Sequence, residues 1–156
     1  MEIAIPYGTT ELTAMLDWAR VLDTLRITDV PAVATPAAVL LEGLHAPLGS
    51  PSLADLVRPE GTVLIIVSDS FRKTGIDRLL PGLISYLNDC GVTDERISFL
   101  FASGSHRPPT TPEQAEILGE DIHARFAGRA FSHDPYDDGN LIYRGETQRG
   151  TPVFIN

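Results

Sequence analysis

The chain has 156 residues, 43% of them apolar and 21% charged, a balance typical of one globular domain and not of a disordered chain. Its formal net charge of -9 argues against nucleic acid and membrane surfaces as partners, because both attract clustered Lys and Arg. The longest apolar stretch, residues 63–67, is far shorter than the ~20 residues that cross a bilayer. With no secretory signal at the start and a single cysteine, Cys90, the sequence predicts a cytoplasmic protein.

The first third of the chain contains one ambiguous segment and two predicted helices. Residues 12–25 fit an alternating strand pattern and a helical pattern, so periodicity leaves both open. Thr35 and Pro36 are typical of a helix start, and apolar residues continue from there to Leu44. Ser50 and Pro51 repeat this signal and predict a shorter helix.

The middle of the chain predicts a βαβ unit. Residues 62–67 form a continuous apolar run, typical of a strand buried on both faces of a parallel sheet, and residues 97–101 are similar. Between them, apolar residues recur at helical spacing from Ile76 to Leu87, and Gly91 follows. We therefore predict an α/β fold with a mainly parallel, Rossmann-like sheet and flanking helices.

The last third predicts one more helix and two extended segments. Thr111 and Gln114 have capping-box spacing, and Gly119 is a typical helix end. Two extended segments in residues 141–155 flank Gln148-Arg149-Gly150. The chain stops directly after apolar residues, and we expect it to be part of a longer protein.

Polar loops follow the two predicted strands, and ligands in open parallel sheets bind beyond the carboxyl ends of the strands. The first loop contains Asp69, Ser70 and Arg72, and the second contains His106 and Arg107. Small residues and backbone N–H groups suit an anion such as phosphate or carboxylate, which an Arg can bind through two hydrogen bonds. The imidazole can move a proton near neutral pH. The loops therefore predict an anion site beside a proton-transfer group.

Other interpretations of these residues are open. A Ser-Asp-Ser loop also fits a helix cap, and both arginines fit solvated surface charges. Ser70, His106 and Asp134 are the residue types of a hydrolase triad, although the sequence has no Gly-x-Ser-x-Gly elbow. Residues 133–138 contain metal-ligand types, but their Pro135 indicates a turn. ATP and NAD are not indicated, because neither a Walker motif nor a dinucleotide fingerprint is present.

At these loops the sequence resembles a known family, the lactate racemases that use a nickel-pincer nucleotide, and their relatives. The similarity covers essentially the whole chain. The matching stretches, in order, are Ile5-Pro6-Tyr7-Gly8, Gly49-Ser50-Pro51, Ser68-Asp69-x-x-Arg72, Ser103-Gly104-Ser105-His106-Arg107-Pro108, His133-Asp134 and Arg149-Gly150-Thr151-Pro152-Val153. The resemblance implies extended structure at the N-terminus, so extra strands are expected at both ends of the chain.

The resemblance also implies a racemase or epimerase that acts on small 2-hydroxy acids of the lactate type. In the family, the loop matching Asp69, Ser70, Phe71 and Arg72 binds the nickel-pincer mononucleotide, and its Arg approaches the substrate carboxylate. The histidine matching His106 is one of two catalytic histidines. A hydride passes from the hydroxyl-bearing carbon to the cofactor and returns to either face. Arg107 is a second candidate for substrate binding.

The sequence also departs from the family pattern. Phe71 stands where the family commonly has Thr, and Lys73 where a Pro usually follows. The family's second catalytic histidine, its cofactor-bearing lysine and its nickel-ligating histidine correspond to positions beyond Asn156. We therefore expect residues 1–156 to form a single α/β domain, the N-terminal half of a two-domain protein, with no metal ligand and no activity without its C-terminal domain. The alternative hypothesis is a non-catalytic α/β module that binds a phosphate or small carboxylate or docks on a protein partner.

Overall fold

A computed structural model describes residues 2–17, 22–23, 25–58 and 60–155. The chain divides into two compact units, Met1–Ala32 and Val33–Asn156. In the first unit, β1 (Glu2–Tyr7) pairs antiparallel with β2 (Thr10–Met15) through a turn at Gly8, whose φ of 60° favours glycine. This hairpin agrees with the extended N-terminus that the resemblance implies. Of the ambiguous segment, residues 18–21 and 24 lie outside the described residues.

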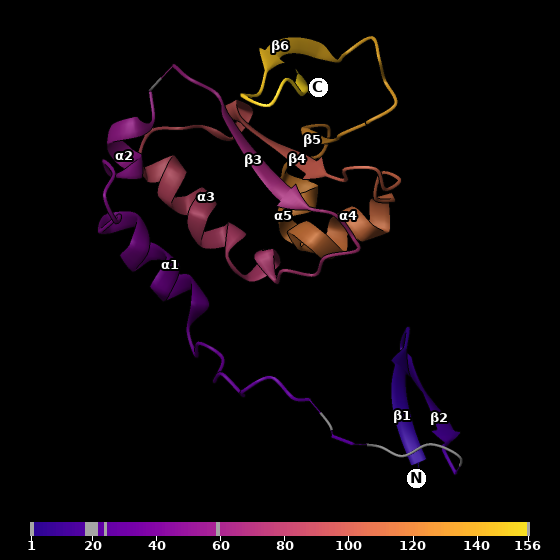
Figure 1. The fold of residues 1–156 in the computed structure, drawn as a ribbon. Coiled ribbons are helices and arrows are strands. Elements are labelled where there is room, and N and C mark those ends of the chain that lie inside the picture. The colour runs from indigo at the N-terminus through magenta and orange to yellow at the C-terminus, as the bar shows by residue number, and fades with distance from the viewer. Residues whose placement is uncertain (1, 18–21, 24, 59, 156) are drawn as a thin grey trace. The chain divides into compact units, whose positions relative to one another are not determined.

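The second unit is built on a parallel sheet with the strand order β3-β4-β5. β3 (Val63–Ser68) pairs with β4 (Ile97–Ala102), which pairs with the short strand β5 (Ala130–Ser132). A 3-10 turn, η1 (Ile76–Arg78), and the helix α3 (Leu80–Asp89) connect β3 to β4, as the sequence predicts (Figure 1). The predicted βαβ unit and the α/β class are therefore confirmed, and β5 is an addition to the predicted elements.

The hydrophobic core lies between one face of this sheet and three helices. Every second residue of β4 is fully buried, and these residues pack against α3, α4 (Thr111–Leu118) and α5 (Glu120–Arg125). Figure 1 shows the three helices on the same side of the strands. The rings of Phe99 and Phe126 meet edge to face with their centroids 5.2 Å apart, a favoured aromatic geometry.

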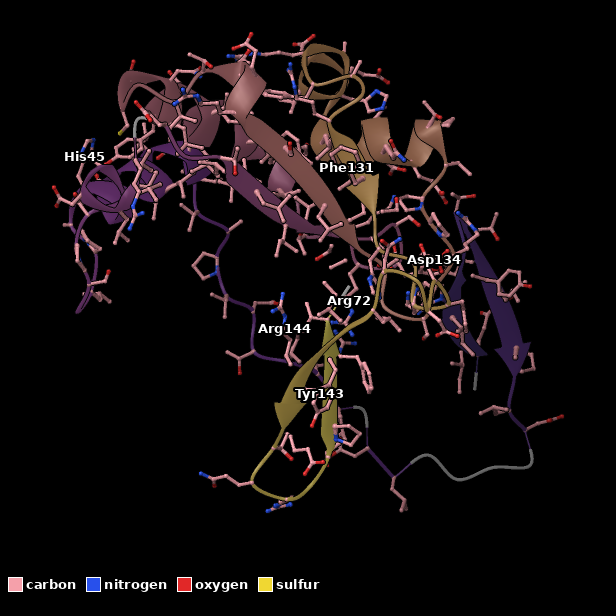
Figure 2. The ribbon with its side chains drawn as sticks, turned by 90° about the horizontal axis from the view of Figure 1, so that it is seen from above. His45, Arg72, Phe131, Asp134, Tyr143 and Arg144 are labelled. Atoms are coloured by element: carbon pink, nitrogen blue, oxygen red, sulfur yellow. The ribbon has the colours of Figure 1, made fainter. Side chains whose placement is uncertain are left out.

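The opposite face of the sheet is open among the described residues. The strand register places Ile66, Leu100 and Phe131 in one row across the three strands. Ile66 is 63% exposed and Phe131, labelled in Figure 2, is 54% exposed. Among the described residues, β3 is therefore covered on one face and not on both as predicted, because α3, α4 and α5 all pack on the other face.

The first two helices begin with serine or threonine followed by an apolar stretch. α1 (Pro36–His45) starts at Pro36, directly after Thr35, as predicted. α2 (Leu53–Leu56) is capped by Ser52, whose Oγ accepts a hydrogen bond from the Asp55 backbone N–H at 3.2 Å. Ser50 is therefore not the cap, since the helix starts two residues later than its sequence signal.

α4 begins with a capping box, although one residue earlier than predicted. The Glu113 carboxylate accepts a hydrogen bond from the backbone N–H of Thr110 at 2.7 Å, and the Thr110 side chain caps the helix in return. The box thus pairs Thr110 with Glu113 rather than Thr111 with Gln114. Gly119 ends the helix, as predicted.

The last strands form a second hairpin. β6 (Ile142–Glu146) pairs antiparallel with β7 (Pro152–Ile155), with an irregularity between Tyr143 and Gly145, and this confirms the two extended segments.

A second 3-10 turn, η2 (Asp94–Arg96), leads into β4. Among the described residues, no helix has the length and apolar character that a membrane crossing requires.

Candidate functional site

The loops after β3 and β4 lie next to each other because the two strands are parallel neighbours. Ser68 pairs with Ala102 at the carboxyl ends of the strands, and the residues that follow, Asp69 and Ser103, are both buried. Each loop then turns sharply. The Arg72 N–H donates to the Asp69 carbonyl at 3.2 Å, and the His106 N–H donates to the Ser103 carbonyl at 3.0 Å.

Asp69 connects the two loops. Its side chain is only 4% exposed, and its Oδ2 lies 2.5 Å from Nδ1 of His106. Its Oδ1 accepts a hydrogen bond from the Phe71 backbone N–H at 3.2 Å. The hydrogen bond with His106 is the main cause that lowers the pKa of Asp69, against the opposing effect of burial. Asp69 is therefore ionised at neutral pH, and a carboxylate can only accept, so Nδ1 of His106 carries the proton.

This protonation leaves Nε2 of His106 as the nitrogen that can accept a proton. The His106 side chain is 47% exposed, in contrast to the buried carboxylate behind it. A buried carboxylate that fixes the tautomer of an accessible imidazole is the arrangement that general-base histidines use.

The two loops line a cavity of about 480 Å³, a volume within the range of small-molecule sites. Its lining residues are Ile66, Val67, Ser68, Asp69, Arg72, Ala102, Ser103, Gly104, Ser105 and His106. Among the residues that the structure describes, none forms an ion pair with Arg72, which is labelled in Figure 2. The cavity thus combines an available guanidinium with an oriented imidazole. These two groups can bind a carboxylate and exchange a proton with a neighbouring hydroxyl.

Comparisons with a family model, a curated protein and a solved structure all point to the same family. Residues 7–156 match the family described as the lactate racemase N-terminal domain. The chain belongs to this family. A lactate racemase from Lactiplantibacillus plantarum is 31% identical over 160 residues, which cover 99% of this chain and 36% of that protein. The solved structure of a lactate racemase apoprotein from Thermoanaerobacterium thermosaccharolyticum matches with a TM-score of 0.72 and 26% identity, covering 100% of this chain and 36% of that one. The chain therefore spans about a third of the length of these relatives.

Phe71 and Arg107 were also predicted as site residues, and both lie beside the cavity and not in its lining. The Phe71 ring lies against the His106 imidazole, with the centroids 4.4 Å apart. Both terminal nitrogens of Arg107 donate to Glu113 at 2.7 Å, and its guanidinium carbon lies 5.9 Å from the Phe71 ring centroid. The bonds from Arg107 hold the pKa of Glu113 far below its usual range. Arg107 is therefore engaged in an ion pair within the domain, whereas no ion pair of Arg72 is found among the described residues.

Ser70 lines a second, adjacent cavity of about 380 Å³. Arg72 lies in the lining of both cavities. Lys73, one of the two departures from the family pattern, lines the second cavity and pairs with Glu116 of α4 at 2.5 Å. The loop after β3 thus contacts α4 through Lys73 while Asp69 points toward His106.

The other residues considered from the sequence lie elsewhere. The carboxylate that holds His106 comes from Asp69 and not from Asp134, so the hydrolase-triad interpretation has no support in the geometry. No group of potential metal ligands forms among the described residues, including the turn at residues 133–138. Away from the cavity, the ring of His45, a histidine at the end of α1, packs against Tyr86 with the centroids 5.2 Å apart, consistent with a structural role.

Sequence reasoning placed Asp69 and His106 at one sheet edge but missed their hydrogen bond. The signal was available, because both residues follow neighbouring parallel strands within four residues of the strand ends. Sequence reasoning also missed the link from Glu113 through Arg107 to Phe71. That link depends on where α4 starts, and the capping box was predicted one residue too late.

Proposed function

We propose that this domain is the N-terminal part of a racemase or epimerase of small 2-hydroxy acids, with His106 as one catalytic acid/base and Arg72 as the carboxylate-binding residue. The observation that carries this proposal is the single cavity lined by both residues, with His106 oriented by the buried Asp69. Membership of the lactate racemase family supports the reaction class.

Arg72 orients the substrate. A planar guanidinium binds a carboxylate through two parallel hydrogen bonds, which fixes the position and the rotation of a small acid. With the carboxylate on Arg72, the hydroxyl on the next carbon faces the His106 side of the cavity. Nε2 of His106 takes the hydroxyl proton as the carbon loses its hydride and gives the proton back when the hydride returns. Asp69 holds the imidazole in the required tautomer and stabilises it while it is protonated.

The residues of the cavity also fit the polar parts of a nucleotide cofactor. Serine hydroxyls and the backbone N–H groups around Gly104 are suitable donors for ribose and phosphate oxygens, and we propose that residues 69–72 contact the nickel-pincer mononucleotide. When bound, this cofactor would supply the acceptor for the hydride. The described residues contain no cluster of metal ligands, so we propose that the nickel ligands come from elsewhere in the full-length protein.

Racemisation requires acid/base groups for both configurations of the substrate. A single imidazole held by Asp69 serves one position of the hydroxyl, so we propose that a second group comes from the rest of the polypeptide. The open row of Ile66, Leu100 and Phe131 supports the presence of further polypeptide, since parallel sheets are normally covered on both faces. We therefore propose that residues 1–156 are the N-terminal part of a longer enzyme and are inactive alone.

The test uses the full-length polypeptide that carries this domain, purified with its cofactor. A panel of single-enantiomer 2-hydroxy acids is incubated with it, and both enantiomers are quantified by chiral chromatography. His106→Gln should lower kcat by about 10²–10⁴, the usual contribution of a general acid/base. His123→Gln, a matched change in α5, should leave kcat unchanged.

Two outcomes would contradict the proposal. If His106→Gln and His123→Gln racemise equally well, His106 is not the acid/base. If no hydroxy acid is racemised but phosphate or a small carboxylate binds in an Arg72-dependent manner, the domain is the non-catalytic binding module of the alternative hypothesis.

A further inference from the structure

We propose that Phe71 is a specificity-determining residue: its exposed ring beside His106 selects 2-hydroxy acids whose substituent is bulky and apolar or aromatic, over lactate with its methyl group. This inference rests on the proposed function and deepens it by naming the substrate class.

The first observation is the exposure of the Phe71 ring. Phe71 is 59% exposed although its ring lies 4.4 Å, between centroids, from the half-exposed imidazole of His106. The planes are tilted by 48°, so the contact leaves much of the phenyl surface facing outward. Large aromatic surfaces in water are unfavourable, and an apolar group placed against this ring would remove part of that surface from solvent.

The second observation is that the position of Phe71 is fixed from two directions. Its backbone N–H donates to Oδ1 of Asp69, the same carboxylate that binds His106. Its ring also carries the guanidinium of Arg107, which two hydrogen bonds hold to Glu113 at the start of α4. A ring that is held at both its backbone and its side chain can act as a rigid wall, which is what discrimination between substrates requires.

The third step follows from the proposed mechanism, which leaves one substituent of the substrate to be placed. The central carbon of a 2-hydroxy acid carries a carboxylate, a hydroxyl, a hydrogen and one variable group. Arg72 takes the carboxylate and His106 takes the hydroxyl in the proposed mechanism. Phe71 precedes Arg72 in the chain, and its exposed ring contacts the imidazole of His106 at the edge of the cavity, so a substituent that extends past His106 meets an apolar surface there.

The test compares a phenyl-bearing ligand with its methyl counterpart in the full-length polypeptide. Turnover is measured as kcat/KM for phenyllactate and for lactate. Binding is measured separately by calorimetry with two carboxylates that lack the hydroxyl and cannot react, 3-phenylpropanoate and propanoate. The variants are Phe71→Thr, which removes the apolar ring, and Phe71→Leu, which keeps an apolar side chain. Leu48→Thr, a change of a fully exposed apolar residue in the loop after α1, is the control.

We expect the parent to favour the phenyl-bearing ligand in both measurements. Phe71→Thr should lower the ratio of phenyl to methyl ligand by about 3–10-fold, as expected for the loss of one aromatic contact. Phe71→Leu should lower it less, and Leu48→Thr should not change it. An unchanged ratio in Phe71→Thr, or a parent that shows no phenyl preference in binding, would overturn the inference.

These outcomes are separable from failure of the proposed function. If the parent racemises several hydroxy acids but the ratios do not depend on Phe71, the racemase proposal stands and the specificity inference is wrong. If nothing is racemised, the racemase proposal fails, and the two carboxylates still test whether Phe71 forms an apolar wall of the site.

Discussion

Replacing Asp69 with Asn tests the role of the carboxylate behind His106. The amide has almost the same shape, and its oxygen can still accept the Phe71 N–H. Its NH₂ group, however, would face Nδ1 of His106, and that contact is favourable only if Nδ1 gives up its proton. The proton then resides on Nε2, which becomes a donor. The imidazole can no longer accept the hydroxyl proton of the substrate.

The expected loss is large in rate and small in stability. A general base in the wrong tautomer loses most of its contribution, so kcat should fall by about 10²–10⁴. The hydrogen bond to a charged group is worth about 1.5–3 kcal/mol when buried, and the half-exposed His106 reduces this to about 1–2 kcal/mol of folding free energy. KM should change little, because Arg72 is untouched.

The assay is chiral chromatography of racemised product under saturating substrate, paired with urea denaturation of the same samples. Asp89→Asn, at the end of α3, is the matched control. Parent kcat in Asp69→Asn would refute the assignment of Asp69 as the residue that orients His106. A large rise in KM with unchanged kcat would instead indicate that Asp69 acts in ligand binding.

Three further predictions concern binding, packing and pH. Arg72→Lys should raise KM about 10-fold or more, because a single ammonium cannot reproduce a bidentate contact, whereas Arg58→Lys, before β3, should leave KM at the parent value. Phe99→Ala should lower the unfolding free energy by about 3–5 kcal/mol in urea denaturation, since the ring is fully buried, while a loss below 1 kcal/mol would contradict the described core. Hydrogen bonds from Arg125 lower the pKa of Asp94 in the folded state. The ionised carboxylate therefore stabilises the fold at pH values above its unfolded pKa of about 4, and this stabilisation is lost as the pH falls through the lower pKa of the folded state. In urea denaturation, the free energy of unfolding should therefore fall less between pH 7 and pH 3 in Asp94→Asn than in the parent. An equal fall in both proteins would contradict a stabilising role for the pair of Asp94 and Arg125.

The elements that the sequence predicted well are those whose signals are local. The apolar run of β3, the helical spacing of α3 and Pro36 at the start of α1 each depend on residues close together in the chain. The position of the two loops at one sheet edge followed from the βαβ rule alone. This rule is why the sequence predicted His106 and Arg72 at the same edge of the sheet.

The features that sequence reasoning missed depend on what lies across the sheet or on the exact start of a helix. A continuous apolar run does not show which face a neighbour covers, so the exposure of Ile66 was not predicted. A capping box shifted by one residue, from Thr111 to Thr110, replaces the amide of Gln114 with the carboxylate of Glu113 as the side chain that faces the loop. Glu113 became available to Arg107 for this reason, and an arginine that the sequence offered for substrate is engaged by its own domain.

The most direct measurement is a crystal structure of the full-length polypeptide with its cofactor and a bound 2-hydroxy acid. We expect the ligand's carboxylate on the guanidinium of Arg72 and its hydroxyl oxygen within about 3 Å of Nε2 of His106. A ligand bound with its hydroxyl away from His106, or with its carboxylate held by other residues while Arg72 faces solvent, would contradict the proposed mechanism.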